Sequence, residues 1–161
     1  MAQTTAVHEA IEPLAGLLGT WRGRGRGFYP TVEDFLYDEE ATFSHIGKAF
    51  LVYGQRTWSA VDGAPLHSET GYWRAVGPGR LEVVLAHPLG IVEVSEGIVG
   101  DNRIELGSTS LARSSTAKEV TSLTRVYELD GDRLTYSLGM AAVGRPLGGH
   151  LEAVLERVPA G

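Results

Sequence analysis

The sequence contains no cysteine, and several features that mark particular protein classes are missing as well. Without cysteine there are no disulfide bonds, thiolate metal sites, iron–sulfur clusters or cysteine nucleophiles, and the composition suits the reducing cytoplasm. The first twenty residues lack a basic start followed by a long apolar run, so we expect no signal peptide. No stretch of about 18 apolar residues occurs, so we expect no membrane-spanning helix.

Basic residues are also scarce. Lysine and arginine total 14 against 20 acidic residues, which gives a formal net charge of −6. A chain of this charge repels nucleic acid and anionic membranes, so we expect neither as a partner. The 161 residues, 43% of them hydrophobic, suit a single globular domain over residues 1–161. The sequence does not decide between a monomer and a homodimer.

Glycine, in contrast, is abundant, with 21 residues against 7 prolines. The glycines separate short segments of alternating apolar and polar residues at intervals of roughly ten residues, which is typical of an all-β sandwich or barrel. One short helix is predicted over residues 8–18, with its apolar residues on one face. We predict ten strands, over residues 20–28, 35–46, 50–59, 66–76, 80–87, 90–99, 103–112, 120–129, 133–142 and 149–158.

Ten consecutive strands favour a closed, antiparallel up-and-down β-barrel of the fatty-acid-binding-protein or lipocalin kind, with the N-terminal helix closing one end. In residues 81–87 and 134–142, most of the residues at alternate positions are apolar, as the inner face of a barrel wall requires. The interior of such a barrel is too wide for side chains alone to fill, so we expect it to hold a ligand.

The first predicted strand alternates strictly between two kinds of residue. Its two faces carry, respectively, Trp21, Gly23, Gly25 and Gly27, and Arg22, Arg24 and Arg26. A dinucleotide-binding motif would need a different glycine spacing and a following helix, and an arginine–glycine arm for nucleic acid disagrees with the acidic chain. We therefore predict a bent barrel strand whose bare face permits close approach of a flat group or another strand, and whose arginine face is solvated.

This segment also carries the pattern Gly-x-Trp-x-Gly-x-Gly followed by Tyr29-Pro30-Thr31. Further characteristic segments are ATFSH (41–45), QRT (55–57), PLHSETGY (65–72), LAHP (85–88), AKEV (117–120), MAAVG (140–144) and HLEAVL (150–155). Together they resemble the nitrobindin family, in particular its mycobacterial and actinobacterial members, over nearly the whole chain from Gly19 onward.

The resemblance implies a ten-stranded barrel that carries haem b at its mouth. It implies that His150, at the start of the last strand, is the axial iron ligand, and that Thr31 contacts the haem. His67 and Met140 match positions that line the pocket. It also implies an enzyme, a peroxynitrite isomerase that converts peroxynitrite to nitrate at ferric haem and binds nitric oxide.

The residues alone place His150 less clearly. Leu151, Ala153 and Leu155 form the cleaner apolar face of the last strand, so simple alternation puts His150 outside the barrel. A β-bulge near Gly148-Gly149, or a position on the rim, would release His150 from this alternation. The same two glycines depart from the family pattern and could loosen the iron site.

The other histidines have separate interpretations. His8 is expected at the surface, and His45 is expected to play a structural role. His87 shares a face with apolar residues and is either capped by a hydrogen bond or placed in the pocket, so it is a further candidate for cofactor binding. Tyr29 and Tyr136 are the competing iron ligands. We see no acid–base pair for the pocket, and therefore expect rearrangement at iron without a proton relay.

Two other functions stay open on the residues alone. The barrel also permits a non-catalytic carrier of a fatty acid or other small apolar ligand, in which Arg56 and Arg125 would bind a carboxylate from inside. Hydrolase chemistry is disfavoured because the sequence has no nucleophile-elbow motif.

Overall fold

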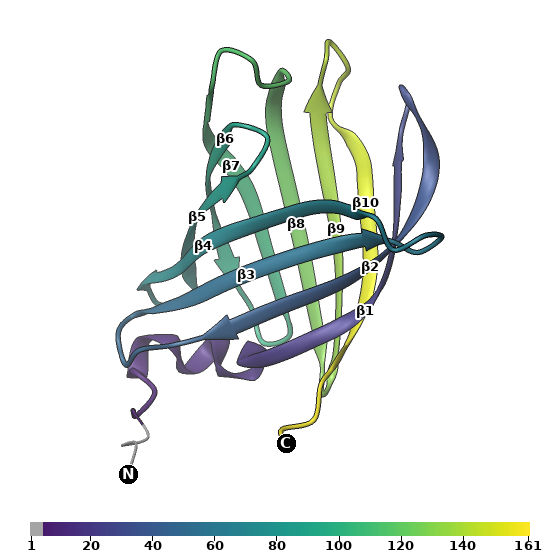
Figure 1. The fold of residues 1–161 in the computed structure, drawn as a ribbon. Coiled ribbons are helices and arrows are strands. Elements are labelled where there is room, and N and C mark those ends of the chain that lie inside the picture. Colours follow the sequence, from purple (N-terminus) through teal and green to yellow (C-terminus); the bar gives the residue numbers. More distant parts are fainter. Residues whose placement is uncertain (1–4) are drawn as a thin grey trace.

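The computed structural model describes residues 5–161, which form one closed antiparallel sheet with a short helix across one end (Figure 1). The strands are β1 (Gly19–Tyr29), β2 (Val32–Ser44), β3 (Phe50–Ser59), β4 (Pro65–Gly77), β5 (Arg80–His87), β6 (Ile91–Val99), β7 (Arg103–Arg113), β8 (Val120–Asp130), β9 (Arg133–Ala142) and β10 (Gly148–Arg157). Each strand pairs with its neighbours along the chain, and β1 pairs with β10 to close the barrel. The predicted ten-stranded up-and-down barrel is confirmed.

The predicted strand ends depart most from the structure in β2, which was expected over residues 35–46 and is observed over Val32–Ser44. Tyr29 pairs directly with Val32, so strand pairing continues to the tip of the β1–β2 hairpin. At the other end, the backbone N–H of Gly47 donates to the His45 ring, and Gly47 has a φ of 79°. This turn directs the chain away from the sheet earlier than the alternation indicated.

The predicted helix is present as η1 (Glu9–Leu17), one residue shorter at each end than expected. It is a 3₁₀-helix rather than an α-helix, and it contains Pro13, which has no N–H to donate. His8 caps it by accepting a hydrogen bond from the Ala10 N–H. Within residues 5–161, no helix combines the length and apolar character needed to cross a bilayer.

Trp21 joins η1 to the barrel floor. Its side chain is fully buried, and its indole N–H donates to the Leu17 carbonyl oxygen at 2.7 Å. The Arg157 guanidinium lies 4.3 Å from the centre of the Trp21 ring and donates to the carbonyl oxygens of Leu18 and Gly16. The first and last strands are thus fastened to the same helix, and both ends of the described chain lie at this end of the barrel (Figure 1).

The glycine face of β1 is covered by aromatic rings of β2. A Cβ atom added to Gly25 would lie 2.2 Å from the Tyr37 ring, and one added to Gly27 would lie 2.1 Å from the Phe35 ring. Any other residue at these two positions would therefore force the aromatic ring to move. On the opposite face the predicted solvated side chains are confirmed, each more than half exposed: Arg22, Arg24 and Arg26.

We expect Trp21→Ala to lower the free energy of unfolding by about 3–5 kcal/mol, because it removes a fully buried indole from the floor. Denaturant titration of the two proteins measures the difference. Trp58, on the outer face beside Arg56, is the matched control, and Trp58→Ala should cost about 1 kcal/mol or less. A loss below about 1 kcal/mol for Trp21→Ala would contradict its role in the floor.

Candidate functional site

The half of the barrel farther from η1 encloses a cavity of about 340 Å³. Its wall combines aliphatic side chains with aromatic and charged ones, and several of its residues stand at or near the turns that form the barrel mouth. The aliphatic part of the wall includes Leu66, Ile91, Val120, Leu123, Leu138 and Leu151. A space of this kind suits a largely apolar ligand that is oriented by a few polar groups.

His150 lines this cavity because β10 carries an extra residue at that point. Gly149 pairs with Gly139, whereas Leu151 pairs with Leu138, so His150 has no partner on β9. This β-bulge is the one that the sequence required for His150 to leave the outer face. Downstream of it, Ala153 and Leu155 are buried in the barrel, as predicted.

The His150 ring is fixed by the backbone of β1. Its Nδ1 lies 2.9 Å from the Phe28 carbonyl oxygen, which only accepts, so Nδ1 carries the hydrogen and Nε2 carries the lone pair. Within residues 5–161, Nε2 has no hydrogen-bond partner. Burial lowers the pKa of His150, which favours the neutral imidazole. The arrangement is that of a histidine prepared to bind a metal through Nε2.

Gly149 contributes to this arrangement. A Cβ atom on Gly149 would lie 2.8 Å from the Phe28 ring, so glycine allows Phe28 to approach β10 closely. The Phe28 carbonyl is the same group that orients His150. Gly149 thus has a packing role here, since its lack of a side chain accommodates the residue that holds the His150 ring, and whether Gly148 and Gly149 also loosen the site stays a prediction.

A buried ion-pair network spans the cavity below the mouth. Arg125 of β8 donates to both carboxylates across the barrel, to Glu69 at 2.8 and 3.1 Å and to Glu93 at 2.8 and 3.1 Å. All three residues are at most 5% exposed. Burial alone would raise the pKa of both carboxyls, but the Arg125 charge holds the pKa of Glu69 well below its usual range and lowers that of Glu93 to about 2. Both glutamates are therefore anionic.

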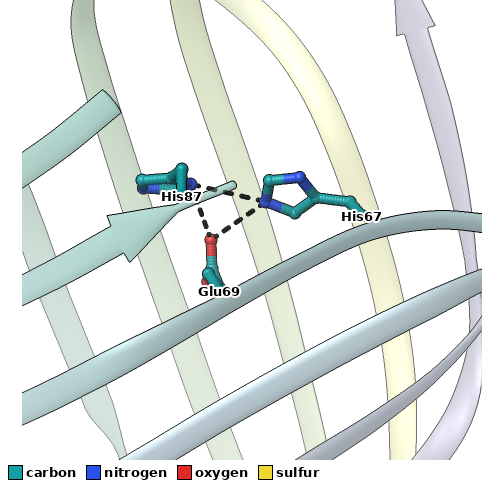
Figure 2. A group of neighbouring side chains, drawn as sticks. All are labelled: His67, Glu69 and His87. Atoms are coloured by element: carbon teal, nitrogen blue, oxygen red, sulfur yellow. Dashed lines mark hydrogen bonds and ion pairs between the residues drawn. The ribbon is translucent and has the colours of Figure 1, made fainter. Parts of the chain in front are cut away.

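Two histidines adjoin this network (Figure 2). His87 at the end of β5 and His67 near the start of β4 have ring nitrogens 3.4 Å apart, and each nitrogen lies 3.5 Å from Oε2 of Glu69. The other ring nitrogen of His87 lies 3.0 Å from Glu93. The expectation of a pocket without an acid–base pair is thus wrong, because the cavity wall holds two imidazoles beside two carboxylates.

A third buried carboxyl group, that of Glu39, lies beside tyrosines. The Tyr136 hydroxyl donates to it at 2.5 Å, and the Tyr37 hydroxyl in turn lies 2.7 Å from that of Tyr136. Burial raises the pKa of Glu39 to about 7, although the hydrogen bond from Tyr136 opposes the shift. Within residues 5–161 no cation forms an ion pair with Glu39, in contrast to Glu69 and Glu93, so burial is the largest influence on its pKa.

The structure brings most of the predicted site residues together. His150, His67, His87 and Met140 all line the cavity. Thr31 does not: it is exposed on the turn between β1 and β2, outside the cavity wall. Of the two arginines expected inside a carrier, Arg125 is buried in the cavity wall, whereas Arg56 is exposed on the outer face and pairs with Glu40.

Sequence reasoning missed the two carboxylates of the ion-pair network. Glu69 has the same parity as His67 and Trp73 in β4, and Glu93 has the same parity as Ile91 and Ser95 in β6. Counting by two along these strands would have placed both carboxylates inside. The alternation therefore carried a signal for both carboxylates, although neither residue was assigned to a face from the sequence.

Comparison with known proteins agrees with this description. Residues 10–157 match the family described as "THAP4-like, heme-binding beta-barrel domain". The chain is 54% identical to peroxynitrite isomerase 2 of Mycobacterium avium, over 95% of this chain and 98% of the relative, and 51% identical to peroxynitrite isomerase of Nocardia farcinica, over 96% and 94%. The crystal structure of Rv2717c from M. tuberculosis superposes with a TM-score of 0.91 at 51% identity, covering 96% of this chain and all of that one.

The fold and the site define a ligand-binding barrel with a histidine at the mouth of an internal cavity. The match over nearly the whole chain assigns it further: the chain belongs to the THAP4-like, heme-binding β-barrel family, and the resemblance inferred from the sequence is confirmed.

The raised pKa of Glu39 predicts how stability depends on pH. Because the folded protein favours the neutral carboxyl, this contribution is complete below the unfolded-state pKa near 4.3 and is lost as the pH rises through about 7. Between pH 5 and pH 8, the wild type should lose about 2–3 kcal/mol of unfolding free energy relative to Glu39→Gln.

Denaturant titrations across this pH range test the prediction. Glu40→Gln is the control, because Glu40 lies on the outer face and its pKa is lowered by hydrogen bonds from Arg56 and Arg22. Its stability profile should run parallel to that of the wild type above pH 5. Parallel profiles for the wild type and Glu39→Gln would show that Glu39 does not titrate in this range.

Proposed function

We propose that this barrel holds haem b through His150 and that, with ferric iron, it isomerises peroxynitrite to nitrate and also binds nitric oxide. The observation that carries the proposal is the geometry of His150, which a bulge releases from the strand alternation and whose Nδ1 is committed to Phe28. Family membership and relatives named peroxynitrite isomerase support the same function.

The residues of the cavity fit this cofactor. A neutral imidazole with one free nitrogen is the usual axial ligand of five-coordinate haem, and the aliphatic wall suits an apolar macrocycle. Met140 and His67 would line the pocket around the group, with His87 deeper in the wall. Thr31, on the exposed hairpin turn, would contact the group only where it extends beyond the cavity.

When bound, ferric haem would supply the iron chemistry for isomerising peroxynitrite and for binding nitric oxide, and His150 would hold it. The chain's own residues do the rest. Phe28 holds the His150 ring in one orientation and one tautomer. Leu138 and Leu151 exclude water from the wall beside it. His67 and His87 place their ring nitrogens in the polar part of the cavity wall.

The carrier alternative is not favoured by the geometry. Arg125 is already engaged by two carboxylates, so the network carries an excess negative charge that repels a fatty-acid carboxylate. Arg56 is outside the barrel and takes no part. We also propose a cytoplasmic location, which the absence of cysteine supports.

We expect His150→Ala to abolish the Soret band of bound haem, or to weaken haem retention severely, because it removes the only proposed iron ligand. The folded barrel should persist, with an unchanged far-ultraviolet circular dichroism spectrum. The measurement is a titration of each protein with hemin, followed by stopped-flow recording of peroxynitrite decay. Acceleration of this decay should disappear together with the Soret band.

His45→Ala is the matched control, since His45 lies in a turn at the opposite end of the barrel and binds the Gly47 N–H. It should behave as the wild type in both measurements. If His150→Ala binds haem as tightly and with the same spectrum, His150 is not the ligand. If the wild type binds haem but leaves peroxynitrite decay unchanged, the ligand assignment stands and the catalytic one fails.

A further inference from the structure

Three donor atoms in the cavity wall form a nearly equilateral triangle (Figure 2). They are Nε2 of His67, Nδ1 of His87 and Oε2 of Glu69, with separations of 3.4, 3.5 and 3.5 Å. Atoms at these separations lie on a circle with a radius of about 2.0 Å, and an ion at its centre would have the bond lengths typical of zinc with nitrogen and oxygen ligands.

These separations are long for hydrogen bonds, which usually measure about 2.7–3.2 Å. The surrounding contacts are shorter: Glu93 lies 3.0 Å from His87, and the Tyr53 hydroxyl donates to Glu69 at 2.8 Å. The wall around the triangle is therefore tightly hydrogen-bonded, while its three corners are held apart at the spacing of atoms that share one metal ion.

The protonation pattern leaves the triangle rich in lone pairs. Glu93 accepts hydrogen bonds from Ser95 and Arg125, so its contact with His87 is one in which Nε2 of His87 donates, and in the neutral ring Nδ1 then presents a lone pair. This lone pair faces the anionic carboxylate of Glu69. A hydrogen atom on Nε2 of His67 can relieve only part of this repulsion, whereas a cation at the centre would satisfy all three atoms.

The outer contacts are those that metal sites use. Glu93 orients His87 from behind, as carboxylates orient metal-bound imidazoles. Tyr53 and Arg125 hold the other oxygen of Glu69, which fixes the carboxylate and leaves Oε2 toward the histidines. Arg125 also lies 3.1 Å from Oε2, so the carboxylate is clamped rather than free to rotate.

The charge of the network favours a cation. One arginine faces two carboxylates, and all three side chains are buried, so these three residues together carry a formal charge of −1, to which the adjoining histidines add only when protonated. An uncompensated charge at such a site is costly. A divalent ion at the triangle would supply the missing positive charge at the point where the lone pairs converge.

We propose that His67, Glu69 and His87 bind one divalent transition-metal ion, of which Zn²⁺ is the type, with the remaining coordination position facing the cavity. All three residues line that cavity, so a small ligand inside it can reach the ion. Two histidines and one glutamate with an open position form the ligand set of catalytic zinc centres. This site is separate from His150 and does not depend on the proposed haem.

The test uses the full chain, treated with a chelator, dialysed and kept free of haem. We expect isothermal titration with ZnCl₂ to show one ion per chain, with micromolar or tighter affinity. Titration with CoCl₂ should give visible absorption bands of a four- or five-coordinate Co²⁺ site. Absence of binding in both titrations would overturn the proposal and would mean that protons alone balance the cluster.

Variants locate the site. His67→Ala and His87→Ala should each weaken Zn²⁺ binding by about 100-fold or more, and Glu93→Gln by about 10–100-fold. The controls His150→Ala and His45→Ala should remain within about threefold of the wild type. Equal affinity in the wild type, His67→Ala and His87→Ala would place the ion elsewhere and overturn the proposal.

Two provisions keep the result decisive. Circular dichroism establishes whether each variant is folded. If His87→Ala is unfolded, the Zn²⁺ affinity of His67→Ala alone tests the site, because the His67 side chain is 29% exposed and its removal should leave the fold intact. His150→Ala separates this proposal from the haem proposal. It should lose haem and keep Zn²⁺.

Discussion

The guanidinium of Arg125 reaches across the barrel interior and binds carboxylates on two strands that are not neighbours of its own. Its ion pairs with Glu69 on β4 and Glu93 on β6 join three sides of the wall. Removing one member of such a buried set leaves an unpaired charge, at a typical cost of about 3–5 kcal/mol. The network also separates the packed floor from the cavity, so the position of the cavity depends on it.

The same network determines what the cavity can bind. The Arg125 guanidinium already donates to two carboxylates, so it is not available to bind the carboxylate of a fatty acid, although its position on an inner strand face suggested that role. Glu93 fixes the hydrogen on His87, and Glu69 directs one oxygen toward both histidines. A single buried cation thus organises the polar part of the cavity wall, which shares strands β4, β6 and β8 with the aliphatic part.

Local alternation was sufficient to predict the barrel, because each strand shows a period of two and glycine-containing turns separate the strands. It failed where the backbone departs from regular pairing. The bulge at His150 turns its side chain toward the interior, whereas counting alternate residues along the strand places it outside. The Gly148-Gly149 pair indicated only that such a bulge was allowed. The tip of the β1–β2 hairpin leaves Thr31 outside the cavity, which no periodicity could reveal.

The ion-pair network could not be predicted for a different reason. Glu69 and Arg125 are 56 residues apart in the chain and meet only because the barrel closes. Alternation can place a glutamate on an inner face, but it does not reveal which residue across the interior forms an ion pair with it. The family resemblance identified His150 because it rests on matched segments, but it carried no information on charges facing one another across the cavity.

The fastening of both chain ends at the floor has a practical consequence. Arg157, near the C-terminal end, donates hydrogen bonds to the end of η1, near the N-terminal end. Both described ends of the chain therefore lie on the side of the barrel away from the mouth (Figure 1). A surface support or a fused protein attached at either end would therefore hold the barrel with its opening directed outward. Immobilised in this way, the protein would keep its cavity accessible to small molecules in a sensor or a flow reactor.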